Sequence, residues 1–268
     1  MSALTVLRGY AQKSDPNTLP LSIRLTHTTD TLTVFDAYPK SIFHFLVLPR
    51  IVPPLTASNL SNLRSLLKCD KNLARKVLEK LNRDAQGVRA MIEDEMVKRY
   101  GFKWGIWTGF HAIPSMEHLH LHVLSNDLCS PAMKKKKHYN SFHPSHGFFL
   151  PLEDVLNWFD AHESYFSTQG TGQERRFEEN FLITLQISRL WPSQYDPMLK
   201  EPLVCWRCYK ELKNIPTLKA HLQTEWDDEA KREKARVERK RKRDDEVNAE
   251  NASGDTNRVA KKRDTASP

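Results

Sequence analysis

The stretch His118-Leu119-His120-Leu121-His122-Val123-Leu124 decides the interpretation of this sequence, because imidazole alternates with aliphatic side chains along it. In a β-strand, successive side chains point to opposite faces of the sheet. The three rings would therefore share one face while the aliphatic residues enter the core. We expect a rigid strand that carries a row of imidazoles on its open face.

Such a row suits chemistry on phosphorus. A neutral imidazole nitrogen is a good nucleophile near neutral pH, and its attack on phosphorus gives a labile phosphoramidate that water can open. Neighbouring rings can fix the tautomer of the nucleophile and donate hydrogen bonds to phosphate oxygens. Two alternatives stay open from the pattern alone. Alternating histidines also suit a zinc ion, and they could be solvent-facing side chains without a role.

The pattern around the histidines predicts an α+β domain in residues 1–165. Apolar residues at helical spacing run from Leu60 to Ile92, with a break near Asp70, so we expect helices that cover one side of an antiparallel sheet. β-branched and apolar runs bounded by turn residues predict the strands. We expect strands at 31–36, 43–48, 104–110 and 118–124.

Composition favours a polyanionic partner over a neutral small molecule. The 268 residues carry a formal charge of +8, with Lys and Arg concentrated in a central run and in the C-terminal tail. The four cysteines form no disulfide framework, which fits a reducing compartment. No N-terminal signal and no apolar stretch of membrane-spanning length is apparent, so we expect an intracellular protein without a membrane partner.

A second, smaller module is predicted in residues 199–228. Cys205 and Cys208 are followed after twelve residues by His221, which is the spacing of a zinc finger, and a helix should present His221. The usual second histidine is absent. Glu225 lies four residues after His221 on the same helical face and is our choice for the fourth ligand. Water or another ligand in that place, and the absence of any metal, are the alternatives.

The remaining segments are polar. Residues 166–198 are expected to connect the two modules, and residues 229–268 form a charged tail with too few apolar residues to fold alone. We expect this tail to be disordered, although its first third could extend the preceding helix. Its unbroken basic run at 239–243 suits a nuclear address or a DNA tether, and an inert solubilising tail is the alternative.

The histidine segment matches the histidine-triad pattern, in which three histidines alternate with apolar residues. Four further segments extend the match: Asp36-Ala37-Tyr38-Pro39-Lys40, His44-Phe45-Leu46-Val47-Leu48-Pro49, Gly109-Phe110-His111-Ala112-Ile113-Pro114-Ser115-Met116 and Lys136-Lys137-His138-Tyr139-Asn140-Ser141-Phe142. Together they resemble the aprataxins, a family of the histidine-triad superfamily, in the fungal form without the forkhead-associated, phosphopeptide-binding domain of animal members. The resemblance covers about residues 1–226.

The resemblance assigns roles to the histidines. His120 would be the nucleophile that takes AMP, His118 and His122 would position it and bind phosphate, and His111 would be the general acid. A partly buried structural ring is the ordinary alternative for His111. The nucleotide would be bound by Asp36, Lys40, Ser115 and Met116. A carboxylate in a turn and an exposed lysine are the ordinary interpretations of the first two.

The resemblance also implies contacts to DNA. The basic and aromatic run just beyond the catalytic segment suits recognition of a phosphate backbone, with a solvated charge run as the alternative. The aromatic wedge of the family's N-terminal helix has no counterpart before Tyr10, where Leu4 is the nearest bulky residue. The expected DNA-binding residues are Arg50, Ser130, Lys134, Lys136, Lys137 and Tyr139.

The resemblance therefore implies a nuclear hydrolase that removes AMP from 5′-adenylated DNA ends left by aborted ligation, through an adenylyl-histidine. Structural zinc is the expected cofactor, and no metal is expected in the chemistry. One alternative is a general histidine-triad hydrolase of nucleoside phosphoramidates or dinucleotides. The other is a DNA-binding repair scaffold without activity.

Overall fold

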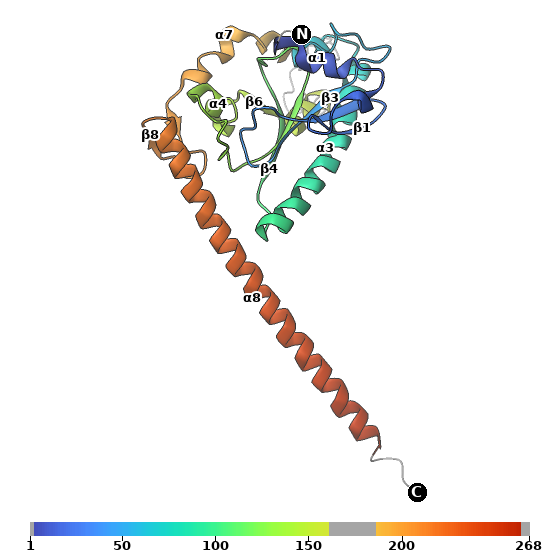
Figure 1. The fold of residues 1–268 in the computed structure, drawn as a ribbon, viewed down its shortest axis with the longest axis vertical. Coiled ribbons are helices and arrows are strands. Elements are labelled where there is room, and N and C mark those ends of the chain that lie inside the picture. Colours follow the sequence, from blue (N-terminus) through green and yellow to red (C-terminus); the bar gives the residue numbers. More distant parts are fainter. Residues whose placement is uncertain (1–2, 161–185, 264–268) are drawn as a thin grey trace, which may run out of the picture.

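The computed structural model describes the backbone of residues 3–160 and 186–263 and the side chains of residues 4–160 and 186–246. Within these residues, an antiparallel sheet of six strands in the order β1-β2-β3-β5-β4-β6 forms the centre of the molecule (Figure 1). The expected α+β class is confirmed. The strands are β1 (Arg24–His27), β2 (Thr31–Phe35), β3 (His44–Pro49), β4 (Ile106–His111), β5 (Leu121–Ser125) and β6 (Phe149–Pro151).

One face of the sheet is covered by helices α2 (Leu63–Leu67), α3 (Lys71–Tyr100) and α5 (Leu152–Asp160). The helix break expected near Asp70 is present, because the Asp70 carboxylate accepts a hydrogen bond from the N–H of Leu73 at 2.9 Å and caps α3. α3 ends at Gly101, whose φ of 83° lies in the left-handed region that glycine adopts without strain.

The other face of the sheet carries the histidines and two packed elements. Helix α1 (Val6–Ala11) contributes Leu7 to a buried cluster that contains Leu46 of β3. The C-terminal module contributes Leu203 to another cluster, which contains Leu124 of β5. The imidazoles therefore lie on a face whose two ends are covered by the N-terminal helix and the C-terminal module.

The histidine segment is only partly a strand. β5 begins at Leu121, so His118 and His120 precede it, and the φ of His118 is 102°. The N–H groups of His118 and Leu119 donate to carbonyls of the 60–61 loop at 3.0 and 2.7 Å. The expectation of a strand through all three histidines is therefore corrected. The loop before α2 accepts the hydrogen bonds that a neighbouring strand would have accepted.

The other predicted strands are confirmed with small shifts, since 31–36 and 43–48 correspond to β2 and β3 and 104–110 to β4. Among the strands and α-helices of residues 3–160, four were not expected: the short edge strands β1 and β6, helix α5 and helix α4 (Lys136–Asn140). β1 has no fully buried residue, so it lacks the alternation that marks a half-buried strand.

The C-terminal module consists of the hairpin β7 (Leu203–Val204) and β8 (Glu211–Leu212), followed by helix α8 (Ile215–Arg263). It is not separate from the main core, because the ring of Trp226 in α8 meets Tyr100 and Trp104 edge to face at 5.4 and 5.6 Å. Most of the expected connecting segment lies outside the described residues. Its end contains α7 (Pro192–Tyr195), which also packs on the main core.

The tail differs from the disordered segment that we expected. α8 continues to Arg263 as one rod that projects from the domain (Figure 1). Its Lys, Arg, Glu and Ala residues are strong helix formers, and pairs such as Lys242 with Glu238, 3.0 Å apart, add local support. In the described part of the chain, no helix has the length and apolar character needed to span a bilayer.

Candidate functional site

The site is organised around a hydrogen bond between two strands. His44 in β3 and His122 in β5 project from the same face, with His44 Nε2 2.9 Å from His122 Nδ1. The main-chain N–H of Lys40 donates to His44 Nδ1 at 3.1 Å. The proton of His44 must therefore reside on Nε2, from which it is donated to His122 Nδ1. This fixes the proton of His122 on Nε2, which is buried.

His120 is held in the opposite tautomer. Its Nδ1 lies 2.7 Å from the main-chain oxygen of His118, so Nδ1 carries the proton and Nε2 keeps its lone pair. His118 Nε2 in turn donates to the carbonyl of Pro49 at 2.8 Å. The ring of His118 is thus bound to protein, and this residue positions His120 through its backbone.

His111, at the end of β4, completes the cluster. The centroid of its ring lies 4.4 Å from that of His122 and 4.5 Å from that of Phe142. His111 Nε2 is buried and has no partner among the described residues. It is therefore free to exchange a proton with a bound ligand.

Burial keeps these rings neutral. It lowers the pKa of His44 and His118 to about 4, and it holds the pKa of His111 and His122 well below the ordinary value of 6.5. Burial also lowers the pKa of His120, against the opposing effects of its backbone hydrogen bond and a nearby carboxylate. At pH 7 the lone pair of His120 is thus available for bonding.

A turn between β2 and β3 places two opposite charges beside the rings. Asp36 Oδ2 lies 3.5 Å from His44 Nε2, and the Asp36 carboxylate accepts from the N–H of Tyr38 at 2.7 Å. Burial alone would raise the pKa of Asp36, but His44 and Lys40 together lower it, so the carboxylate is charged. Burial lowers the pKa of Lys40, whose ammonium donates to the carbonyl of Tyr38.

The last two predicted nucleotide-binding residues precede the histidines. Ser115 is exposed, and Met116 is half-buried against the cluster beneath α1. The next residue, Glu117, forms an ion pair with Arg8 of α1 at 2.6 Å. The 115–116 segment is therefore fixed to the N-terminal helix just before it leads into His118.

The alternative of a zinc ion at the histidines can be examined at one group of possible ligands, which consists of Asp36, His44 and His122. Their ligand atoms lie within 4.8 Å of one another. A histidine bound to a metal through one nitrogen carries its proton on the other, which acts as a donor. In His44, however, Nδ1 accepts a hydrogen bond from Lys40, so Nε2 must carry the proton. The geometry favours a chain of hydrogen bonds over a metal centre here.

His44 was not among the predicted site residues. Its signal was present in the sequence, because His44 interrupts an otherwise apolar strand at 43–48. A buried polar group in such a strand requires a partner. The partner is set by the pairing of β3 with β5, which sequence periodicity does not specify.

The lysines of the predicted DNA-binding set are accessible. Lys134 and Lys137 are exposed and Lys136 is half-buried at the start of α4. Burial and then the charges of Lys40 and Lys137 lower the pKa of His138 in α4, so the turn at Lys40 lies within electrostatic range of the start of α4.

Three other residues of that set make hydrogen bonds within the protein. Tyr139 is buried, and its hydroxyl donates to the carbonyl of Val204 at 2.8 Å and accepts from the N–H of Trp206 at 2.9 Å. It therefore fastens α4 to the C-terminal module. Ser130 is buried and accepts from the N–H of Ala132 at 3.2 Å within its own turn.

Arg50 has a similar structural role. Its Nη1 donates to the carbonyls of Thr28 and Thr29, both at 3.2 Å, and its Nη2 to those of Lys13 and Ser14 at 3.0 and 2.9 Å. All four N–H groups of the two terminal nitrogens are used. Arg50 therefore ties two loops together, and its expected contact with DNA stays a prediction.

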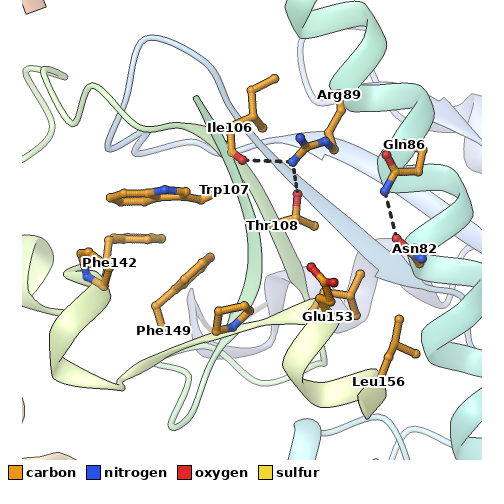
Figure 2. A pocket seen from close by; sticks show the side chains of 13 residues that line it. Asn82, Gln86, Arg89, Ile106, Trp107, Thr108, Phe142, Phe149, Glu153 and Leu156 are labelled. Atoms are coloured by element: carbon orange, nitrogen blue, oxygen red, sulfur yellow. Dashed lines mark hydrogen bonds between the residues drawn. The ribbon is translucent and has the colours of Figure 1, made fainter. Parts of the chain in front are cut away.

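A pocket of about 590 Å³ lies beside the cluster at the outer edge of β4 (Figure 2). Phe142 and Phe149 form one wall, and both rings also neighbour His111, at 4.5 and 6.2 Å between centroids. On the other side, Arg89 donates to the carbonyl of Ile106 at 3.0 Å. This part of β4 extends beyond the end of β6. The carbonyl of Ile106 therefore has no β6 residue to pair with, and it accepts from Arg89 instead.

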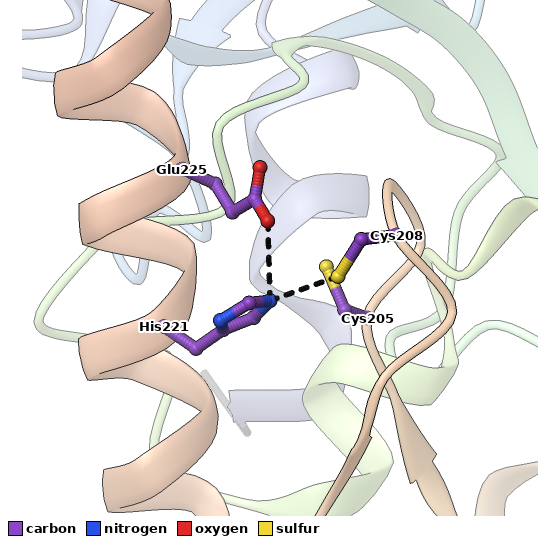
Figure 3. Close-up of side chains that lie close together, drawn as sticks. All are labelled: Cys205, Cys208, His221 and Glu225. Atoms are coloured by element: carbon purple, nitrogen blue, oxygen red, sulfur yellow. Dashed lines mark hydrogen bonds and ion pairs between the residues drawn. The ribbon is translucent and has the colours of Figure 1, made fainter.

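The four predicted metal ligands converge in the C-terminal module, where their ligand atoms lie within 4.8 Å of one another (Figure 3). His221 Nε2 is 3.1 Å from Cys208 Sγ and 3.5 Å from Glu225 Oε1, and Cys205 is buried beside them. Two thiolates, an imidazole and a carboxylate in one cluster suit tetrahedral zinc. The residues fit the ion, with Glu225 as the fourth ligand.

Family models match both parts of the chain. Residues 6–138 match the model described as scavenger mRNA decapping enzyme C-term binding. Residues 145–228 match the C2HE / C2H2 / C2HC zinc-binding finger. The first range contains all the histidines of the cluster, and the second contains the four proposed zinc ligands.

Solved structures share this architecture. The aprataxin orthologue Hnt3 in complex with DNA superposes with a TM-score of 0.59 at 27% identity, over 87% of this chain and 100% of that chain. Hnt3 from Schizosaccharomyces pombe gives a TM-score of 0.57 at 26% identity, over 85% and 93% of the two chains.

Curated relatives agree. Aprataxins of Ciona intestinalis and Danio rerio are 30% and 32% identical over 71% and 72% of this chain, which spans only 39% and 46% of their lengths. An aprataxin-like protein of Schizosaccharomyces pombe is 30% identical over 74% of this chain and 72% of its own length. The chain therefore belongs to the aprataxin family.

Proposed function

We propose that this protein is a hydrolase that removes AMP from 5′-adenylated DNA ends through a covalent intermediate on His120. The observation that carries the proposal is the tautomer of His120, whose Nδ1 proton is bound to the carbonyl of His118 and whose Nε2 lone pair is free. Two neighbours support the choice of substrate: Hnt3 was solved with DNA, and with DNA and guanosine.

In the first step, His120 Nε2 attacks the phosphorus of the AMP moiety. A P–N bond forms, and the bond from that phosphorus to the bridging oxygen breaks. The 5′-phosphate of the DNA leaves with a proton from His111. Free His111 is neutral, but the negative phosphates of a bound substrate raise the pKa of a neighbouring imidazole, so His111 takes up that proton from solvent when the substrate binds.

In the second step, water attacks the adenylyl-histidine and the P–N bond breaks. AMP departs, His120 Nε2 regains its lone pair and His111 accepts a proton from the attacking water. His122 Nε2–H donates to a phosphate oxygen where negative charge develops. Asp36 would accept from a ribose hydroxyl, and Lys40 would neutralise phosphate. The proposed chemistry uses only protein groups and water.

The surroundings are proposed to hold DNA. Lys134, Lys136 and Lys137 would contact the phosphate backbone beside the site. Zinc at Cys205, Cys208, His221 and Glu225 would stabilise the module that Tyr139 fastens to this face. Folding of such a module is coupled to its metal. A nuclear location, inferred from the basic runs, stays a prediction.

The test compares a nicked duplex carrying a 5′-adenylate with a small adenylate such as a nucleoside phosphoramidate. We expect AMP release from the duplex to be faster at equal concentration and to fall as salt rises, with little effect of salt on the small substrate. His120→Ala should abolish both reactions. His27→Ala, in the edge strand β1, is the matched control and should keep full activity.

Quenching with detergent at alkaline pH during turnover should trap the protein with one AMP attached to His120, because a phosphoramidate is stable to base and labile to acid. Faster turnover of the small substrate would favour a general nucleotide hydrolase. DNA binding without any turnover that His120→Ala removes would identify a scaffold. Failure to trap the adduct under single-turnover conditions would contradict the covalent step.

A further inference from the structure

Helix α8 leaves the domain just after its last packed residues. Ala230 is 8% exposed and belongs to the main core, whereas from Lys231 to Glu246 every side chain except that of Glu233 is exposed. In Figure 1 this part of α8 stands away from the domain. No burial of apolar surface explains its sequence, so its charges require another explanation.

These charges are not evenly distributed. Nine of the residues from Lys231 to Arg243 are basic and two are acidic. Four arginines are spaced at i, i+4, i+7 and i+11, which places them within a sector of about 60° on a helix of 3.6 residues per turn. We name this row the arginine stripe; it consists of Arg232, Arg236, Arg239 and Arg243.

The other side of the same segment also has four basic residues, but three of them are lysines. Its acidic residue Glu238 is paired with Lys242 at 3.0 Å, away from the arginine stripe. Arg236 is 2.7 Å from Glu233 in an exposed pair of the kind that contributes little and yields readily to another partner. The four residues of this opposite face are Lys231, Lys234, Arg241 and Lys242.

Arginine is the side chain best suited to phosphate, because its planar fork donates two parallel hydrogen bonds to two oxygens. At 1.5 Å per residue the arginine stripe is about 16 Å long. Phosphates of one DNA strand advance about 3.4 Å along the axis, so the row matches about five of them. A regular, unpacked row of this kind fits a repeating polyanion.

We propose that the arginine stripe binds the phosphate backbone of duplex DNA outside the stretch held by the catalytic domain. This rests on the proposed function, because the duplex is the substrate's own. The stripe begins about 16 Å and ends about 33 Å along α8 from His221. It therefore reaches base pairs up to about ten positions from the module and extends the footprint on DNA.

The test uses two variants of the full chain that lose equal charge. One replaces the four stripe arginines by glutamine, and the other replaces Lys231, Lys234, Arg241 and Lys242 by glutamine. Glutamine keeps helix propensity, and circular dichroism checks that α8 persists. Binding is measured by fluorescence anisotropy on unadenylated nicked duplexes that extend about 20 or about 5 base pairs from the nick, lengths chosen from the reach of α8.

We expect the stripe variant to bind the long duplex about tenfold or more weakly at 0.1 M salt, with a salt slope smaller by about three to four. On the short duplex its affinity should match that of the unmodified protein. The opposite-face variant should lose much less on both. Equal losses in the two variants would overturn the proposal and indicate diffuse attraction by the tail.

The proposal would also be overturned if the stripe variant bound DNA unchanged and lost only its nuclear accumulation. That result would indicate that the arginines bind an acidic import receptor. Failure of this inference is distinguishable from failure of the proposed function. A protein that binds the long duplex through the stripe but releases no AMP refutes the function alone. One that releases AMP while both variants bind equally refutes the stripe alone.

Discussion

His44 Nε2 lies 2.9 Å from His122 Nδ1, so a ring in β3 sets the position of the proton on a ring in β5. The direction of donation follows from the N–H of Lys40, which fills the other nitrogen of His44. His122 consequently presents an N–H, not a lone pair, toward the space beside His120. The turn that carries Asp36 and Lys40 is thereby coupled to the tautomer of a proposed phosphate-binding ring.

Replacing His44 by leucine should lower kcat/KM on adenylated DNA by about a hundredfold, because His122 would lose the donor that orients it. His44→Gln keeps a side-chain N–H and should lose less. A positioning role also predicts that the pH profile of kcat changes in His44→Leu. Equal loss in both variants with an unchanged pH profile would point to a packing role instead.

Stability should fall as the pH falls from about 6.5 to about 4. The pKa of His44 and of His118 is lowered by burial from 6.5 to about 4, so below 6.5 the unfolded chain binds protons that the folded chain does not. Each ring contributes on the order of 3 kcal/mol, which is fully present above pH 6.5 and lost by about pH 4. Denaturant unfolding at pH 7.5, 6 and 4.5 measures this. A free energy of unfolding that stays level over this range would contradict the buried, neutral rings.

Tyr139→Phe should loosen the C-terminal module. The substitution leaves the carbonyl of Val204 and the N–H of Trp206 without their partner, at a cost of about 1–3 kcal/mol. We expect a lower Tm and faster proteolysis within the module. Tyr209→Phe is the matched control, since Tyr209 in the same module is 73% exposed. Weaker DNA binding at unchanged stability would restore a direct contact for Tyr139.

The sequence predicted those parts of the fold that local pattern determines. β-branched and apolar runs bounded by turn residues located β2 and β3, helical spacing located α3, and ligand spacing located the cluster of Cys205 with Glu225. The edge strand β1 was not predicted, because it has no fully buried residue and so no apolar pattern. The full length of helix α8 was not predicted, because exposed charged residues are typical of both a solvated helix and a disordered chain.

The site was harder to predict where partners are distant in sequence. His44 meets His122 only through the register of two strands that are 78 residues apart at this bond. Tyr139 and Arg50 have residue types that suit contact with nucleic acid, and their burial or internal hydrogen bonds depend on tertiary packing. Residue type and proximity to a motif therefore do not reveal these internal roles.

Zinc affinity should depend on Glu225. Glu225→Ala leaves three protein ligands, and we expect zinc to bind more than about tenfold more weakly in competition with a chromophoric chelator. Glu225→His supplies an imidazole and should bind zinc firmly. Gln223→Ala should leave the affinity unchanged, because Gln223 lies between the two ligands of α8 in sequence but is exposed and donates to Asp227 at 3.0 Å. Equal zinc affinity in Glu225→Ala and the unmodified protein would show that water or another group is the fourth ligand.

Arg50→Gln should affect stability more than DNA binding. Gln cannot reproduce the four hydrogen bonds to the carbonyls of residues 13–14 and 28–29, so we expect a loss of about 1–3 kcal/mol in the free energy of unfolding. The salt slope of DNA binding should stay unchanged. Lys137→Gln is the matched control, since an exposed phosphate contact lowers that slope by about one without destabilising the fold. A reduced slope in Arg50→Gln at unchanged stability would instead assign Arg50 to the DNA-binding surface.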